Sequence, residues 1–546
     1  MRARVGAAGA ALLLSTLAPR VLQAQLADAV GPVAAGGTPR WTEAWSPLVP
    51  LGELPRTLPG VELGFADLLI LSAPRIGLFW TAGNPAALPR EVGELRTEFQ
   101  VGSVDHSGDF RRPFDPGDET HQVVAGRVWG PLGSKGAGIG RVVVDHGSFK
   151  NQAFSDLLVP YSTEPFTVID TLGEETSRTA VQLEGAGGWQ LGRLGLGLGF
   201  GYAQQETRTV ESAVPVLNRT ANPGVTGGVT YDLAGGKVHI GTYGRWQQTA
   251  ETVSILSVAA ASRVYRFGGF NDPTPINLVA TFFSQRFNHK AWAAGATVGA
   301  ELGAVSWTAF AQREDLTSEN FNTTFGEGMA DNWDADGWTA GAAAQADLAA
   351  HHLLVTVDAR YSNITGEEKR AEIDGTPFTT DETRWHVNGE LRGKSDNRWE
   401  AALGLGIKRE DRRRSDGLAE AATDIRAWRP AAALEVAHWL SATVALSGGV
   451  AVSEYNPSGS VPLAATLGPV YQNWLAPAVA LEATEATAHA FMGTLRWQAR
   501  AALGFWVQVR SESASPPDNR SGLLPGAPRG DRDRLRAAFG VVLGGR

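Results

Sequence analysis

Residues 193–203 read Arg-Leu-Gly-Leu-Gly-Leu-Gly-Phe-Gly-Tyr-Ala, the clearest example of a pattern that recurs along the chain. Its large apolar residues occupy every second position, and glycine fills the positions between them. Because successive side chains of a strand point to opposite faces, the stretch gives one apolar face and one small face. A helix would mix the two sets around its axis. The stretch is therefore predicted to be a long β-strand.

The same alternation recurs along the chain. We count about 18 such strands, within a range of about 16–20. They are placed at 94–105, 119–130, 136–146, 177–191, 193–206, 224–234, 236–249, 290–302, 304–315, 336–348, 351–362, 382–393, 396–409, 424–437, 440–453, 486–497, 500–511 and 532–545. Two further stretches also alternate and are interpreted as loop hairpins or additional strands, namely 276–287 and 473–484.

Strand length and connection length together indicate a membrane barrel. A strand that crosses a bilayer at a tilt needs about 9–11 residues, whereas soluble strands average about 5–6. Short turns such as Gly192-Arg193 and Gly303-Ala304 alternate with long polar connections such as 147–175 and 250–275. We therefore predict an all-β fold, a single large antiparallel transmembrane β-barrel with short periplasmic turns and long extracellular loops. A soluble propeller or β-helix would show a repeat of fixed length, and none is found.

In this architecture the chain resembles bacterial outer-membrane β-barrels of porin-like size, over roughly residues 94–546, and uncharacterised barrel families among them. The resemblance implies an outer-membrane location, contact with outer-membrane lipid, and insertion by the barrel-assembly machinery. Such barrels usually end in an aromatic residue, and here Phe539 is the nearest candidate. Asn84-Pro85-Ala86-Ala87-Leu88 is also similar to an early segment of the long-chain fatty-acid transporter barrels.

The chain before the barrel divides into two parts. Residues 1–24 have a positive start, an uncharged run from Val5 to Ala18 and small residues near Ala24, which is the layout of a secretory signal peptide. Residues 25–93 are rich in proline and are predicted to be a periplasmic tether or a segment that plugs the lumen. We favour at least partial insertion, because the apolar residues of 65–80 are costly to expose to water.

Composition excludes several classes of function. The 546 residues contain no Cys, which removes disulfide scaffolds, thiol catalysis and Cys-ligated metal centres. A net charge of −9 argues against nucleic acid as a partner. With 43% hydrophobic residues the chain is not predicted to be disordered.

The outward face carries aromatic residues near the predicted strand ends. They are interpreted as an interfacial girdle, because they share the alternation of the aliphatic residues; sugar stacking in a channel is the alternative. The girdle is predicted to contain Trp189, Trp385, Trp399, Trp439 and Trp497.

The inward face carries charges of both signs. They form either a charged constriction that selects ions or a paired lining that stabilises a wet wall. The candidates are Arg245, Asp358, Arg360, Arg384, Glu390, Arg392, Arg398, Glu400 and Lys408.

Metal binding and catalysis find weaker support. Asn332, Asp334 and Asp336 precede Gly337 with the spacing of the first half of a calcium loop, and a solvated acidic loop is the alternative. We predict no catalytic residues and no cofactor. A hydrolase at the outer rim would have to use Asp105-His106 or Asp145-His146.

The sequence thus favours an exported outer-membrane barrel that passes small solutes, as a porin-like channel or a transporter. The alternatives are a barrel without transport function (an anchor, an adhesin or an envelope-assembly component) and, less favoured, the rim hydrolase. A homo-oligomer is compatible with this class, and the solute remains open.

Overall fold

The computed structural model describes most of the barrel. The described residues are 83–91, 95–111, 116–153, 166–170, 173–210, 216–255, 264–268, 274–275, 283–322, 330–348, 353–370, 377–395, 398–460, 472–473, 476–500, 502–516 and 530–544. The predicted signal peptide and residues 25–82 lie outside them, so the predicted domain boundaries stay predictions there.

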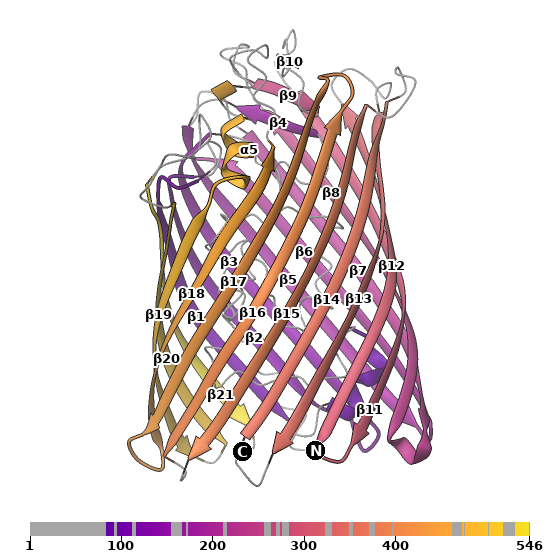
Figure 1. Ribbon diagram of the computed structural model, residues 1–546, viewed down its shortest axis with the longest axis vertical. Helices are drawn as coiled ribbons and strands as arrows, with labels where there is room; N and C mark the ends of the chain where they lie inside the picture. Colours follow the sequence, from indigo (N-terminus) through magenta and orange to yellow (C-terminus); the bar gives the residue numbers. More distant parts are fainter. Residues whose placement is uncertain are drawn as a thin grey trace.

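An antiparallel sheet of 18 strands closes on itself through β1 and β21 (Figure 1). The predicted fold class and strand number are confirmed. The barrel strands are β1 (Arg96–Gly108), β2 (Asp118–Pro131), β3 (Gly136–Ala153), β5 (Gly173–Leu191), β6 (Leu194–Thr209), β7 (Val216–Leu233), β8 (Val238–Ile255), β11 (Phe283–Leu302), β12 (Val305–Asn322), β13 (Ala330–Leu348), β14 (Leu353–Arg370), β15 (Phe378–Ser395), β16 (Trp399–Asp416), β17 (Ala421–Trp439), β18 (Val444–Ser460), β19 (Ala486–Arg500), β20 (Leu503–Ser515) and β21 (Arg532–Gly544).

Short turns lie at one end of the barrel and long connections at the other (Figure 1). Gly192 and Gly303 each begin a two-residue turn with φ of 65°, a backbone conformation that favours glycine and suits tight hairpins. The strands extend further toward the long connections than predicted, so that β8 ends at Ile255 rather than at 249. Ladder hydrogen bonds continue there although the outward residues become polar, which is why an alternation pattern tuned to apolar residues stops early.

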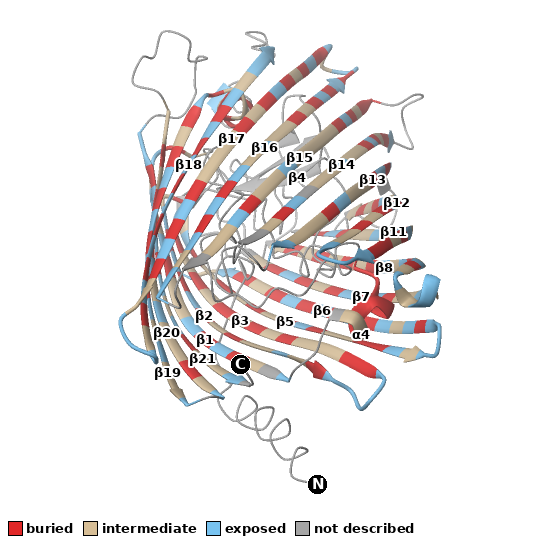
Figure 2. Ribbon diagram, turned by 60° about the horizontal axis from the view of Figure 1, so that its bottom comes forward, coloured by how far each residue is buried: buried red, intermediate tan, exposed pale blue. Residues whose placement is uncertain are grey.

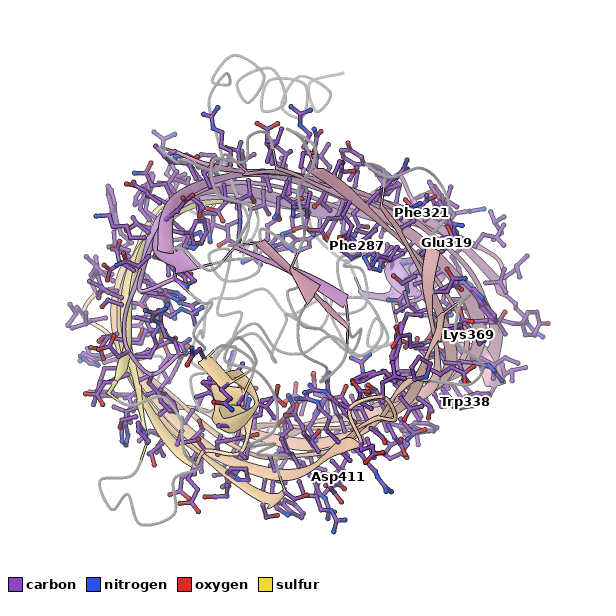
Figure 3. All side chains as sticks on the ribbon, turned by 90° about the horizontal axis from the view of Figure 1, so that it is seen from above. Phe287, Glu319, Phe321, Trp338, Lys369 and Asp411 are labelled. Carbon is purple, nitrogen blue, oxygen red and sulfur yellow. The ribbon has the colours of Figure 1, made fainter. Side chains whose placement is uncertain are left out.

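Three smaller elements belong to the long connections. A three-stranded sheet of β4 (Phe166–Asp170), β9 (Val264–Gly268) and β10 (Thr274–Pro275) joins two connections at the outer mouth. Helix α5 (Ala476–Glu482) lies inside the ring of strands when the barrel is seen from above (Figure 3). This helix corrects the interpretation of 473–484 as a hairpin or strand. Among the described residues, no helix is long and apolar enough to cross a membrane.

Buried and exposed residues alternate along the strands, as Figure 2 shows. On β6 the outward residues from Leu194 to Tyr202 are exposed apolar side chains, and Glu206 and Arg208 follow on the same face. On β16 the outward run from Trp399 to Ile407 likewise gives way to charged residues. The apolar band thus covers the half of each strand nearest the short turns, as a bilayer requires. The protein is an outer-membrane β-barrel.

Aromatic side chains mark the outer border of this band. Trp246 pairs with Trp292 in the register of β8 and β11, and Trp385 packs edge-on against Trp428 with ring centroids 5.1 Å apart. Trp338 belongs to the same level and is 54% exposed on the outer side of the ring (Figure 3). Indole rings prefer the headgroup level, so these residues form a belt at the outer interface.

Placing a charge in the apolar band should be costly. Leu198 is 66% exposed at the centre of the outward run of β6, so Leu198→Arg should lower the free energy of unfolding in bilayers by about 2–4 kcal/mol. The matched control is Gln204→Arg, on the same face of the same strand but beyond the apolar band, with a cost of about 0–1 kcal/mol. Urea titration of the barrel in vesicles measures both; equal effects would contradict the placement of the band.

Candidate functional site

The charges predicted to face the lumen lie on inward positions, and most have partners there. Arg245, Arg360, Arg384, Glu390, Arg392, Glu400 and Lys408 share the alternation of the buried polar residues on their strands. Asp358 follows the same alternation on β14, but its side chain lies outside the described part, and Arg398 is exposed at the turn before β16.

Several of these charges form ion pairs along or between strands. Arg392 contacts Glu390 at 3.0 Å, and Lys408 contacts Glu410 at 2.8 Å. Arg360 instead lies over the ring of Phe310, 5.6 Å from its centroid. These ion pairs are of the kind that a paired lining predicts, and both interpretations of these charges stay predictions.

One network of ion pairs joins β15, β16 and α5, and we call it the Arg412 cluster. It contains Glu382, Arg384, Lys408, Glu410, Arg412, Arg414 and Glu482. Arg412 donates from Nε and Nη2 to Glu382 at 2.9 and 2.7 Å, and from Nη1 to Glu482 at 3.0 Å. Arg414 reaches the same Glu482 carboxylate at 3.4 Å. Burying these guanidinium groups is tolerable because each is paired with a carboxylate.

Sequence reasoning missed the centre of this cluster. The predicted strand ended at 409, before Arg412 and Arg414, although both continue the inward alternation of Lys408. Continuing the predicted strand along the same inward positions to residue 414 would have included both. Glu482 could not be found in this way, because α5 reaches the lumen through a connection and not through a barrel strand.

A second network, the Arg534 cluster, lies where the barrel closes. It contains His106, Glu119, Arg510, Glu512, Arg532, Arg534 and Arg536 from β1, β2, β20 and β21. Arg534 donates to Glu512 at 3.0 Å, and Arg532 donates to Glu119 at 2.8 Å. The centres of both clusters are buried, since Arg414, Arg510 and Arg534 are only 1–2% exposed, whereas Arg384 and Lys408 at the edge of the Arg412 cluster are partly exposed. A wall facing an open water channel would be far more exposed, so this wall is covered.

The remaining part of the lumen wall differs in chemistry. From β6 to β13 the buried polar residues on the inward face are mostly neutral amides and hydroxyls, with His239 and Glu251 as the exceptions, and apolar residues lie among them. Asn218 donates to Glu251 at 2.5 Å, Asn222 to Thr249 at 2.8 Å, and Gln285 to Asn320 at 2.6 Å. The lumen thus has one arginine-rich side and one side of neutral hydrogen-bonding groups.

Residues 83–91 lie inside the barrel near the short turns. They form a turn of 3-10 helix (Pro85–Ala87) followed by α4 (Leu88–Glu91), and the residues from Asn84 to Leu88 are all buried. Asn84 donates to the carbonyl oxygens of Val229 and Thr242 at 3.2 and 3.3 Å. Arg90 forms an ion pair with Asp232.

Glycine makes room for this segment on the inward face of β5 to β8. A Cβ atom at Gly188, Gly197 or Gly228 would overlap the segment, and each of these glycines faces inward. We call this surface the glycine seat. It explains two glycines on the small face of residues 193–203, because Gly195 and Gly197 leave room for the seated segment.

One predicted member of the aromatic girdle is wrong. Trp439 has the inward alternation of β17, and its indole Nε1 donates to Glu400 at 3.4 Å. It sits at the strand end, where its neighbour His438 takes the outward position and packs on Trp399 with centroids 4.1 Å apart. Trp189, Trp385, Trp399 and Trp497 lie on the outward face.

The calcium-loop interpretation is also wrong in its geometry. Asn332, Asp334 and Asp336 lie on strand β13, where residues two apart point to one face instead of converging on an ion. Asp334 pairs with Lys369 at 2.7 Å, and Asp336 pairs with Arg313 at 3.2 Å. In the part of the chain that the structure describes, no three acidic or histidine side chains are grouped to hold a metal.

At the outer rim, Asp145 does not pair with His146, its neighbour in sequence. Asp145 is buried and accepts from His121 on the adjacent strand at 3.2 Å, whereas His146 has the outward alternation. The second carboxylate at His121 is Glu119, at 3.5 Å. Among the hydrogen bonds of the described residues, none joins His121 to a hydroxyl that could act as nucleophile. We assign no reaction to this pair.

Comparison with known proteins places the chain in a family. It belongs to DUF6850, a family of unknown function, which matches residues 85–542. That match begins within the seated segment and runs almost to the end of β21. No curated protein matches.

Solved structures to which the chain is similar include a transporter, a channel and a receptor. The copper transporter OprC shares 8% identity at a TM-score of 0.39, covering 83% of this chain and 81% of its own. The TodX monoaromatic hydrocarbon channel shares 10% at 0.31, covering 91% and 97%. The alcaligin outer-membrane receptor FauA of Bordetella pertussis shares 11% at 0.39, covering 81% and 75%. At such values, ligand and mechanism have to be argued from this chain's own residues.

Proposed function

We propose that this barrel carries small hydrophilic solutes across the outer membrane and prefers anions. The observation that supports this most strongly is the chemistry of the inward wall from β16 to β21, where cations outnumber carboxylates. The buried or half-buried cations are Lys408, Arg412, Arg414, Arg429, Arg496, Arg510, Arg532, Arg534 and Arg536, and the carboxylates are Glu400, Glu410, Asp416, Glu435 and Glu512.

The two sides of the lumen suit different parts of such a solute. Guanidinium groups bind carboxylates and phosphates through paired hydrogen bonds. The amides and hydroxyls opposite can replace the water shell of a hydroxyl or amide without imposing a charge. A fully apolar solute would find neither surface favourable.

The covered wall supports transport that requires an opening step. We propose that the N-terminal segment 25–93 narrows the lumen, since residues 83–91 occupy the glycine seat inside the barrel. Helix α5 narrows it from the outer side, where Leu481 packs among alanines of β17 to β20.

Vesicle swelling tests the proposal without assuming a particular solute. Protein reconstituted into liposomes should admit small carboxylates faster than neutral sugars of similar size, and both faster than cationic amino acid esters. Swelling that is no faster than in empty liposomes, with correctly folded protein, would overturn it and favour a barrel without transport function.

A further inference from the structure

The group that Arg412 and Arg414 both bind indicates which solutes the lumen recognises. Both guanidinium groups converge on one carboxylate, that of Glu482, at 3.0 and 3.4 Å. Glu482 is the last residue of α5 and belongs to the connection between β18 and β19, so it comes from outside the barrel wall. The two guanidinium groups are therefore already occupied by a carboxylate that the β18–β19 connection supplies.

The inner surface of the barrel packs closely against α5. Leu481 is 1% exposed and belongs to an apolar cluster whose barrel members include Ala427, Ala451 and Ala488. The Tyr455 hydroxyl donates to the backbone carbonyl of Glu482 at 2.6 Å. Alanines at inward positions leave the space that α5 fills, just as the glycine seat receives residues 83–91.

The charge balance of the cluster favours exchange of its carboxylate. Glu382 and Glu410 lie on the strands β15 and β16, whereas Glu482 ends the short helix α5 in the connection between β18 and β19. If Glu482 leaves, Arg412 keeps Glu382, but both arginines lose a shared acceptor in a buried place. A buried cation without its acceptor is costly, so a replacement anion is strongly favoured there.

We propose that Arg412 and Arg414 form a binding site for small carboxylate solutes, and that Glu482 occupies it as a built-in competitor which an entering carboxylate displaces. This proposal rests on the proposed function and names the solute class. It makes α5 an autoinhibitory element: binding of the solute frees the helix from the wall at the site where the solute passes.

Succinate binding to the full chain in detergent tests this site independently of transport. Removing the competitor raises the apparent affinity, because a ligand binds only the fraction of sites left free. Glu482→Gln should therefore bind succinate about tenfold more tightly than the unaltered protein. The matched control is Glu485→Gln, three residues away and exposed, which should leave the affinity unchanged. Arg414→Gln in the Glu482→Gln background should abolish the gain.

Hydrogen exchange reports displacement directly. The amide of Thr484 donates to Leu481 at 3.0 Å in the closed arrangement, and its exchange should become faster when succinate binds. Equal affinities in all variants, tighter binding of inorganic phosphate than of succinate, or exchange unaffected by bound succinate would each overturn the inference. Faster swelling with carboxylates but no effect of Glu482→Gln would leave the proposed function standing and remove only this site.

Discussion

Deletion of residues 26–90 is expected to raise the single-channel conductance of the reconstituted barrel several-fold. The deleted stretch contains almost all of the segment that occupies the glycine seat, where Asn84 and Leu88 are fully buried. Removing it takes out a layer of chain from the lumen without touching a barrel strand, since β1 begins at Arg96. Planar-bilayer recordings of the deletion variant beside the full chain measure the change.

A pair of glycine variants separates this effect from damage to the barrel. Gly228 faces inward, and a side chain there would overlap Asn84; Gly227 faces outward with open space around it. Gly228→Leu should reproduce part of the conductance increase, and Gly227→Leu should not. A deletion variant that folds and conducts like the full chain would show that the seated segment does not limit passage.

Loss of Arg412 should have the largest effect on stability among single lumen substitutions. Arg412→Ala leaves Glu382, which is 1% exposed, with one cation fewer and removes the closest partner of Glu482. Removing one partner of a buried ion pair costs about 3–5 kcal/mol of stability. Because Arg384 also pairs with Glu382 and remains in the variant, we expect a loss at the lower end, about 3 kcal/mol.

The neighbouring arginine provides the control for that measurement. Arg413 is exposed on the outward face of β16, so Arg413→Ala removes the same side chain from the opposite surface. Its effect should stay within about 0.5 kcal/mol. Equal losses for the two variants in urea titrations would mean that the Arg412 cluster does not stabilise the barrel.

Much of the barrel could be predicted because a lipid-facing strand has to alternate. The pattern Leu-Gly-Leu-Gly of 194–197 shows both that the segment is a strand and which side chains face the lipid. Each predicted strand corresponds to an observed one. Strand ends were predicted less well. Beyond Ile407 the outward face carries Arg409 and Asp411, which pair at 2.8 Å, and such residues give no apolar signal.

The site was only partly predictable, for a physical reason that differs between its parts. Arg384 and Lys408 follow from alternation alone, because a strand fixes which way they point. Glu482 depends on how a long connection folds back on the wall, which no local periodicity encodes. Trp439 shows the converse error: it is predicted to share the outward alternation, but it is the last residue of β17, beyond the predicted strand end, and has the inward position there.

The preference of the lumen for anions can be measured as the reversal potential of the conducting barrel in a planar bilayer under a KCl gradient, with the deletion variant used to obtain robust currents. The arginine-rich wall from β16 to β21 predicts a reversal potential displaced toward the chloride equilibrium potential, and a smaller displacement at high salt, where charges are screened. A reversal potential displaced toward the potassium equilibrium potential would contradict the assignment of an anion-preferring lumen.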